Sequence, residues 1–116
     1  MAEYYFFVNV RVDVNKYPSG QALLDRWLDE AEAAAEAEQA GAIQSLWRSA
    51  SEPRVYGVVK LEGENVLHAQ AVLLEALQGL PMGQDGALIV EEASEVRPYT
   101  EWREFLRQRA RSRTQT

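Results

Sequence analysis

The segment that most constrains the fold is the N-terminal run Glu3–Val14, in which side chains alternate strictly between two faces. From Tyr4 onward every second residue is apolar, and this period of two predicts a β-strand. The opposite face begins with Tyr5 and Phe7 and becomes polar only from Asn9. A strand that is apolar on both faces needs a cover on each side. The run therefore predicts a sheet that packs against helices on one face and against another surface on the other.

Capping and breaking residues divide the rest of the chain into regular elements. Ser19 is a suitable cap for a helix over about residues 20–40, and Gly41 stands where a left-handed helix stop is expected. Asn65 is a suitable cap for a second helix that reaches about Gln78. The remaining expected elements are strands over 42–50, 54–61 and 87–92, a tight joint at 51–53, a loop over 80–86 and a C-terminal helix over 99–111.

The element order β-α-β-β-α-β is that of the ferredoxin-like α+β fold, an antiparallel four-stranded sheet with both helices on one face. We expect this domain to occupy residues 1–96 and a basic helical tail to occupy residues 97–116. Alternation in the second strand places Ile43 and Trp47 opposite Leu46, so the bare face of the sheet would again be apolar. A second copy of the same sheet is the simplest cover, which predicts a homodimer.

Charge and residue content argue against several classes of function. Residues 97–116 carry six arginines and two glutamates, whereas residues 1–96 carry six basic and 16 acidic residues. An acidic body repels phosphate backbones, so we expect no nucleic-acid partner. The chain has no Cys and one His, so we expect no metal site. The pattern indicates neither a signal peptide nor a membrane span, and the expected location is the cytoplasm with no membrane partner.

The segment Gly41–Ala50 (GAIQSLWRSA) resembles the G-x-x-x-x-L-W-R-x-A segment of bacterial muconolactone delta-isomerases. Residues 73–82 (LLEALQGLPM) are similar to the second helix of that family, which ends in L-P-L or L-P-M. The resemblance extends over about residues 3–92. It implies a dimeric α+β barrel, often assembled into larger rings, that acts on a small molecule without metal or organic cofactor. It also implies that Asp29 and Glu30 correspond to an acidic pair in the family's first helix, whereas the basic C-terminal extension lies outside the family pattern.

Moving a double bond in an unsaturated lactone requires a group that takes and returns a proton. A carboxylate can do both when partial burial raises its pKa toward the working pH, and Glu30 and Asp29 are the candidate catalytic residues. The apolar residues of the first helix form one stripe, made of Leu24, Trp27, Leu28, Ala31, Ala34 and Ala35. Glu30 borders this stripe, whereas Asp29 points more outward. The alternative is that both carboxylates belong to a solvated acidic face.

Further side chains are candidates for holding a small substrate, namely Arg48, Tyr56, His68, Trp27 and Trp47. If Trp47 faces a partner sheet, Arg48 faces the helices, where it would bind an anion, pair with Glu30 or reach solvent along its stem. His68 lies in the first turn of the second helix, where its neutral form is favoured. A lone His at such a place is more often a surface residue, and aromatic strand residues are more often part of the core.

The leading hypothesis is a cofactor-independent isomerase of the muconolactone delta-isomerase type, acting on a small unsaturated lactone or a related oxygenated metabolite. The alternatives are a cofactor-free monooxygenase or polyketide cyclase on the same barrel, and a non-catalytic small-molecule-binding or assembly protein. A buried carboxylate facing an enclosed apolar cavity would favour proton transfer. A cavity with polar groups but no such carboxylate would favour an oxygenase or a binding protein, and a filled barrel would favour assembly. We expect the arginine-rich tail to lie over the acidic first helix, either its own or that of a neighbour.

Overall fold

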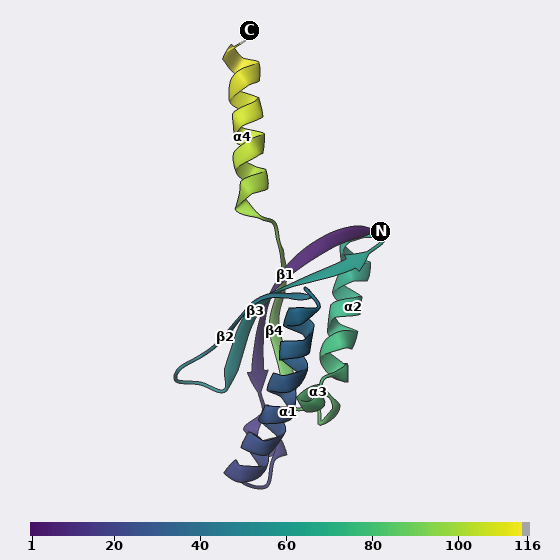
Figure 1. Ribbon diagram of the computed structural model, residues 1–116, viewed down its shortest axis with the longest axis vertical. Helices are drawn as coiled ribbons and strands as arrows, with labels where there is room; N and C mark the ends of the chain where they lie inside the picture. The colour runs from purple at the N-terminus through teal and green to yellow at the C-terminus, as the bar shows by residue number, and fades with distance from the viewer. Residues whose placement is uncertain (115–116) are drawn as a thin grey trace.

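The computed structural model describes residues 1–114 and shows a four-stranded antiparallel sheet with two long helices on one face (Figure 1). The strands lie in the order β2-β3-β1-β4, so the α+β class and the ferredoxin-like element order are confirmed. Along the chain the elements are β1 (Ala2–Val12), the 3-10 helix η1 (Val14–Lys16), α1 (Gly20–Gln39), β2 (Ile43–Arg48), β3 (Arg54–Gly63), α2 (Val66–Gly79), α3 (Pro81–Gln84), β4 (Leu88–Val96) and α4 (Tyr99–Thr114).

The expected helix boundaries are confirmed by their capping interactions. The Ser19 side chain accepts a hydrogen bond from the Ala22 amide at 3.1 Å, at the start of α1. The Asn65 side chain accepts one from the His68 amide at 2.9 Å, at the start of α2. Gly41 has a φ of 85°, the left-handed conformation that a glycine adopts without steric cost after a helix. Local sequence chemistry is therefore sufficient to fix where both long helices begin and where the first one stops.

The main core lies between the sheet and α2. Phe6 and Val8 from β1 pack with Ala69 and Leu73 from α2, and all four side chains are buried. A smaller cluster, built on Val12, Met82 and Ala87, connects the end of β1 to α3 and to the start of β4, with Trp27 of α1 packed against it. Full burial of each large apolar side chain contributes about 1.5–3 kcal/mol to the free energy of unfolding.

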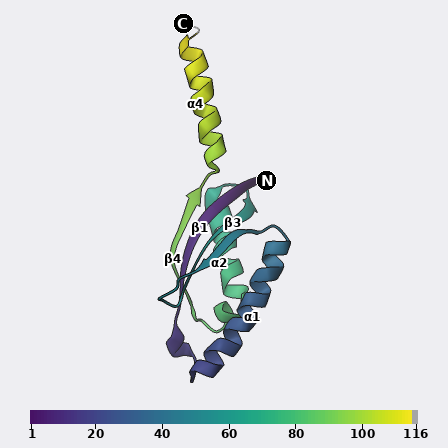
Figure 2. The same cartoon turned by 60° about the vertical axis from the view of Figure 1, so that its left-hand side comes forward.

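The opposite face of the sheet carries aromatic side chains at its middle and charged side chains at one end. Phe7 stacks on Tyr56 with ring centroids 6.4 Å apart. Beyond this pair, Arg54 donates hydrogen bonds to Asn9 at 2.9 Å and to Glu91 at 2.6 Å. Within residues 1–114 no helix covers this face (Figures 1 and 2). The middle of this face is therefore apolar, as expected, whereas one end of it is charged.

Three local expectations are wrong. The segment predicted as a loop over 80–86 contains the one-turn helix α3, and β4 continues to Val96 instead of stopping at residue 92. The β2 strand is irregular between Ile43 and Ser45, so Ile43 pairs with Val59 and lines the same side of the sheet as the helices. Ile43 therefore does not share the face of Trp47, because a bulge adds one residue and reverses the alternation before it.

The C-terminal helix α4 extends away from the domain (Figures 1 and 2). The prediction that it lies over the chain's own first helix is wrong, because α1 lies on one face of the sheet and α4 continues beyond the end of β4 (Figures 1 and 2). The last two residues of the predicted tail, 115–116, lie outside the described residues. No helix in the described part of the chain is long and apolar enough to span a membrane.

Candidate functional site

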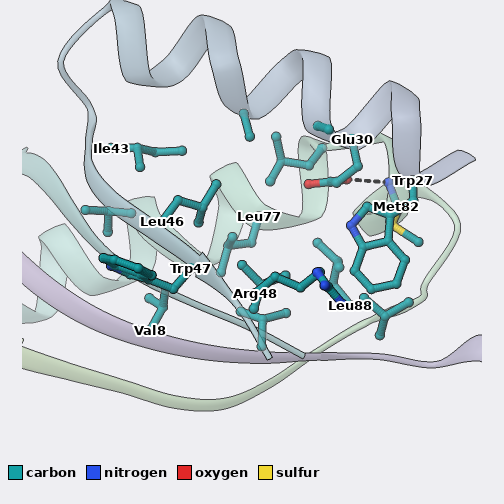
Figure 3. Close-up of a pocket in the computed structure, with 17 residues that line it drawn as sticks. Val8, Trp27, Glu30, Ile43, Leu46, Trp47, Arg48, Leu77, Met82 and Leu88 are labelled. Atoms are coloured by element: carbon teal, nitrogen blue, oxygen red, sulfur yellow. Dashed lines mark hydrogen bonds between the residues drawn. The ribbon is translucent and has the colours of Figure 1, made fainter. Parts of the chain in front are cut away.

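A cavity of about 300 Å³ lies between α1 and the helix-covered face of the sheet (Figure 3). Its walls are almost entirely apolar, and Glu30 and Arg48 are the charged residues among those that line it. The apolar lining consists of Val8, Val10, Val12, Trp27, Ala31, Ala34, Ile43, Leu46, Trp47, Val55, Val59, Leu77, Leu80, Met82 and Leu88. The cavity exists because α1 presents small alanines to this part of the sheet, and these leave space that larger side chains would fill.

Glu30 projects from α1 into this cavity and is half-buried. Its Oε1 accepts a hydrogen bond from the backbone amide of Met82 at 2.8 Å. Burial raises the pKa of the Glu30 carboxyl above its ordinary value, while the Met82 amide and the nearby Arg26 partly oppose the rise. The result is a carboxylate that holds a proton more readily than one in water, within a mainly apolar space.

A second group of polar side chains fixes α3 beneath Glu30. Arg26, one turn before Glu30 on α1, donates hydrogen bonds to Asp85 at 2.8 Å and to the Pro81 carbonyl at 3.0 Å. The Tyr17 hydroxyl donates a further bond to Asp85 at 2.8 Å. These bonds lower the pKa of Asp85, and burial together with Asp85 raises the pKa of Tyr17 to about 12. The segment that carries the Met82 amide is thereby tied to α1 at two points.

Gly83 permits the close packing of this segment. A Cβ atom at residue 83 would overlap the carbonyl oxygen of Leu77 at the end of α2. Only glycine allows the turn after α2 to pass this close to the helix backbone. The contact places the Met82 amide directly within reach of the Glu30 carboxylate.

Arg48, the last residue of β2, also lines the cavity, and its side chain lies near Trp27 and Leu88 (Figure 3). It pairs in register with Val55, on the helix-facing side of the sheet, and its Nη1 donates a hydrogen bond to the Ser49 carbonyl at 3.1 Å. A second, more open hollow adjoins the cavity here and shares Trp27 and Arg48 with it. Arg48 is exposed, and it lies where the hollow and the cavity adjoin.

The structure brings four of the predicted site residues to this cavity. Glu30, Trp27 and Arg48 line it, and Trp47 contributes to its rim although its side chain is 70% exposed. Trp47 pairs in register with Tyr56, so its ring lies mainly on the bare face of the sheet. The expected separation of Trp47 and Arg48 onto opposite faces is therefore observed.

The other predicted residues do not line the cavity. Asp29 is turned outward, where it pairs with Arg26 at 3.2 Å. Tyr56 stacks on Phe7 on the bare face of the sheet. His68 lies at the start of α2, and its Nδ1 accepts a hydrogen bond from the Glu64 amide at 3.0 Å, which closes the turn before that helix.

Sequence reasoning missed the residues that hold Glu30 in place. Arg26 precedes Glu30 by four positions, which puts both side chains on the same helix face and could have drawn attention to it. Asp85 is 59 residues away from Arg26, and no local pattern connects the two. Tyr17 and the Met82 amide are equally remote in sequence, so only the folded chain shows their role.

The described residues do not assemble a set of metal ligands. Within residues 1–114 no three His, Asp or Glu side chains come together as a metal site would require. The polar groups that reach the cavity are the Glu30 carboxylate and the Arg48 guanidinium, which suit a small molecule with an acidic carbon and an anionic or carbonyl oxygen.

Fold and cavity together define a class, namely small α+β domains of ferredoxin-like order with a carboxylate in an apolar cavity beneath the first helix. A family model described as muconolactone delta-isomerase matches residues 4–91 of the chain. The chain belongs to this family, as its L-W-R and L-P-M segments predicted. A comparison with curated proteins finds no match. The family match ends within β4, and α4 lies beyond it.

Proposed function

We propose that the protein is a cofactor-independent isomerase that moves a carbon–carbon double bond in a small unsaturated lactone or a related oxygenated metabolite. The observation that carries the proposal is the position of Glu30, a half-buried carboxylate in an apolar cavity. Membership of the muconolactone delta-isomerase family supports the same reaction type.

Glu30 acts as base and then as acid in this proposal. Its carboxylate removes a proton from a carbon adjacent to the unsaturated system, and the electron pair of the broken C–H bond moves into a dienolate. The same carboxyl returns the proton at another carbon, so the double bond shifts and no oxidant or reductant is consumed. The raised pKa of Glu30 suits both steps, because a carboxylate in water is too weak a base near neutral pH.

Arg48 and Trp27 complete the site. The Arg48 guanidinium stabilises an anionic oxygen of the substrate or of the dienolate, since a charged donor forms stronger hydrogen bonds to an anion than a neutral donor does. Trp27 forms an apolar wall for the ring. Asp29 has no part in the reaction, because its carboxylate is outside the cavity and paired with Arg26.

We further propose that two copies pair through the bare faces of their sheets to form a dimeric α+β barrel. The Phe7–Tyr56 stack and the exposed Trp47 form an apolar surface that water would otherwise cover. In this arrangement Tyr56 and Trp47 contact the partner. His68 does not bind substrate, because its Nδ1 accepts the hydrogen bond from the Glu64 amide that closes the turn before α2.

The test is an isomerisation assay with a panel of butenolides, including carboxylate-bearing ones, in D₂O. Product formation is followed by absorbance and deuterium incorporation by NMR. We expect Glu30→Gln to lower kcat/KM by roughly 10²–10⁴-fold, the usual contribution of a general acid–base residue. Asp29→Asn, one residue away but outside the cavity, is the matched control and should change the rate only slightly.

Two results would overturn the proposal. One is a folded wild-type protein that neither shifts the double bond nor exchanges a proton in any lactone of the panel. The other is a Glu30→Gln variant that is as active as the wild type. Circular dichroism spectra of both proteins establish that the comparison is made between folded chains.

A further inference from the structure

The helix α4 extends away from the rest of the domain (Figures 1 and 2) and carries an exposed apolar stripe. Trp102 and Phe105 stack with ring centroids 5.4 Å apart, and their side chains are 52% and 55% exposed. Tyr99 and Leu106 extend the same exposed apolar surface. An isolated helix of 16 residues is marginally stable in water, and such stripes are typical of helices that pack against a partner.

The first helix offers a surface that matches this stripe. Leu24 and Leu28, one turn apart on α1, are 64% and 60% exposed. The sequence groups both leucines in one stripe with Trp27, but neither lines the cavity; Leu24 lines the open hollow beside it, and both side chains remain largely exposed. An exposed pair of leucines on one helix face is an unpartnered apolar surface.

The two helices also have opposite charges. Helix α1 holds six carboxylates against the single guanidinium of Arg26. Helix α4 holds five arginines against two glutamates. This combination favours packing of α4 on α1. Burial of the two apolar surfaces provides affinity, and the opposite charges around them distinguish this pairing from pairings of like-charged helices.

The two surfaces do not meet within one copy of the chain. The molecule measures 68 × 31 × 24 Å, and α4 occupies one end of the long axis while the N-terminal turns of α1 occupy the other (Figures 1 and 2). A helix that points away from the domain at one end does not reach Leu24 and Leu28 at the opposite end.

We propose that α4 of one copy packs its apolar stripe on the exposed Leu24–Leu28 surface of α1 in a second copy. Pairing of two α4 helices is disfavoured, because it would bring two sets of five arginines together. The exposed Leu67 and Leu74 on α2 form an alternative surface, but Glu75 is the only acidic residue of that helix. Charge complementarity therefore selects α1.

Cysteine pairing tests this contact directly, because the natural chain has no cysteine. One full-length copy carries Leu28→Cys and a second, differently tagged copy carries Leu106→Cys. The two are mixed in a glutathione redox buffer, and disulfide-linked products are separated by mass. We expect the mixed Leu28→Cys/Leu106→Cys product to dominate. The matched control replaces the first variant with Leu67→Cys, whose side chain is also exposed but lies on α2.

Charge reversal provides the second measurement. Arg103→Glu with Arg107→Glu, added to the copy that carries Leu106→Cys, should reduce the yield of mixed disulfide several-fold. Asp25→Lys with Glu32→Lys, added to the copy that carries Leu28→Cys, should restore that yield. A dominant product linking two Leu106→Cys chains would overturn the proposal, as would equal yields with Leu28→Cys and Leu67→Cys. Yields that do not respond to either charge reversal would also overturn it.

Discussion

The amide of Met82 donates a hydrogen bond to Glu30 at 2.8 Å, and this bond joins the short helix α3 to the carboxylate that faces the cavity. Its effect on the Glu30 pKa is opposite to that of burial, because a donor favours the ionised form while desolvation disfavours it. Burial is the larger effect. The carboxylate is therefore held in one orientation while its basicity stays above that of an exposed glutamate.

The raised pKa of Glu30 makes the folded state less stable at higher pH. The folded chain binds this proton more tightly than the unfolded chain, so stability falls as the pH rises above the ordinary glutamate value of 4.5 through the folded pKa. Glu30→Gln keeps an oxygen for the Met82 amide but loses the charge. We expect its free energy of unfolding to exceed that of the wild type at neutral pH, with the difference vanishing below pH 4.5. Urea denaturation at several pH values measures this, and a variant less stable at neutral pH would contradict it.

Removal of Arg26 should shift the pH dependence of the reaction. Arg26 lowers the pKa of Glu30, whereas Asp85 raises it. Arg26→Gln removes the favourable charge and leaves Asp85 uncompensated, so the pKa of Glu30 moves further up. The limb of the kcat/KM profile on which activity increases with pH should move to higher pH than in the wild type. Lys16→Gln, an exposed cation on η1, should leave the limb in place. A limb that moves down or stays fixed in Arg26→Gln would be inconsistent with this electrostatic role.

The cavity can be filled from α1 without touching the charged residues. Ala34 lines the cavity one turn after Glu30, and Ala34→Leu adds three carbons to this space. Burying them should raise the free energy of unfolding by about 1–2 kcal/mol, at ~0.8 kcal/mol per carbon less some strain. The same change should lower kcat/KM by about tenfold or more, equivalent to ~1.4 kcal/mol of lost binding or positioning. The control Ala76→Leu, at an exposed site on α2, should do neither. Unchanged kcat/KM in Ala34→Leu would place the ligand elsewhere.

The ionisation of Tyr17 reports on its hydrogen bond to Asp85, which connects the segment after η1 to the end of α3. Its pKa is raised to about 12 by burial and by Asp85. The unfolded chain releases this proton near the ordinary value of 10.0, before the folded chain does, so stability is lost between about pH 10 and 12. Absorbance titration should show a late-ionising phase in the wild type, and this phase should be lost in Tyr17→Phe. A Tyr17→Phe titration that superimposes on that of the wild type, apart from its amplitude, would contradict the assignment.

Much of this architecture is encoded in local sequence patterns. Where the structure differs from the prediction, the difference has a physical cause. The alternation of β1 and the caps at Ser19 and Asn65 are local, and the structure confirms them. The phase of Glu30 relative to Trp27 follows from helix geometry alone, which is why its inward orientation was predictable. The reversal at Ile43 arises from a bulge, for which the strand itself carries no sequence signal.

The supporting contacts of the site depend on tertiary structure. The bonds from Arg26 to Asp85 and from Glu30 to the Met82 amide join segments more than fifty residues apart, at separations of 59 and 52. Periodicity predicts which face a side chain occupies, but not which distant segment will meet it. The exposure of Leu24 and Leu28 was missed for a related reason, since periodicity groups them with Trp27 but does not show which part of the stripe lines the cavity.

A charge on the bare face of the sheet should separate the proposed dimer. Val58 lies opposite Phe7 in the register of β3 and β1, at the centre of the surface that would meet the partner. Val58→Glu would bury an unpaired carboxylate in this surface. The cost of that burial is several kcal/mol, which is enough to cancel the favourable free energy of association of a small interface. Sedimentation velocity should show the wild type as a multiple of the 13.1 kDa chain and the variant at a lower mass, because only the proposed contact of α4 with α1 would still join copies. Leu67→Glu, on the exposed surface of α2, is the matched control and should keep the wild-type mass. The paired sheets would be refuted by a wild type that sediments as a monomer, or by a folded Val58→Glu that keeps the wild-type mass.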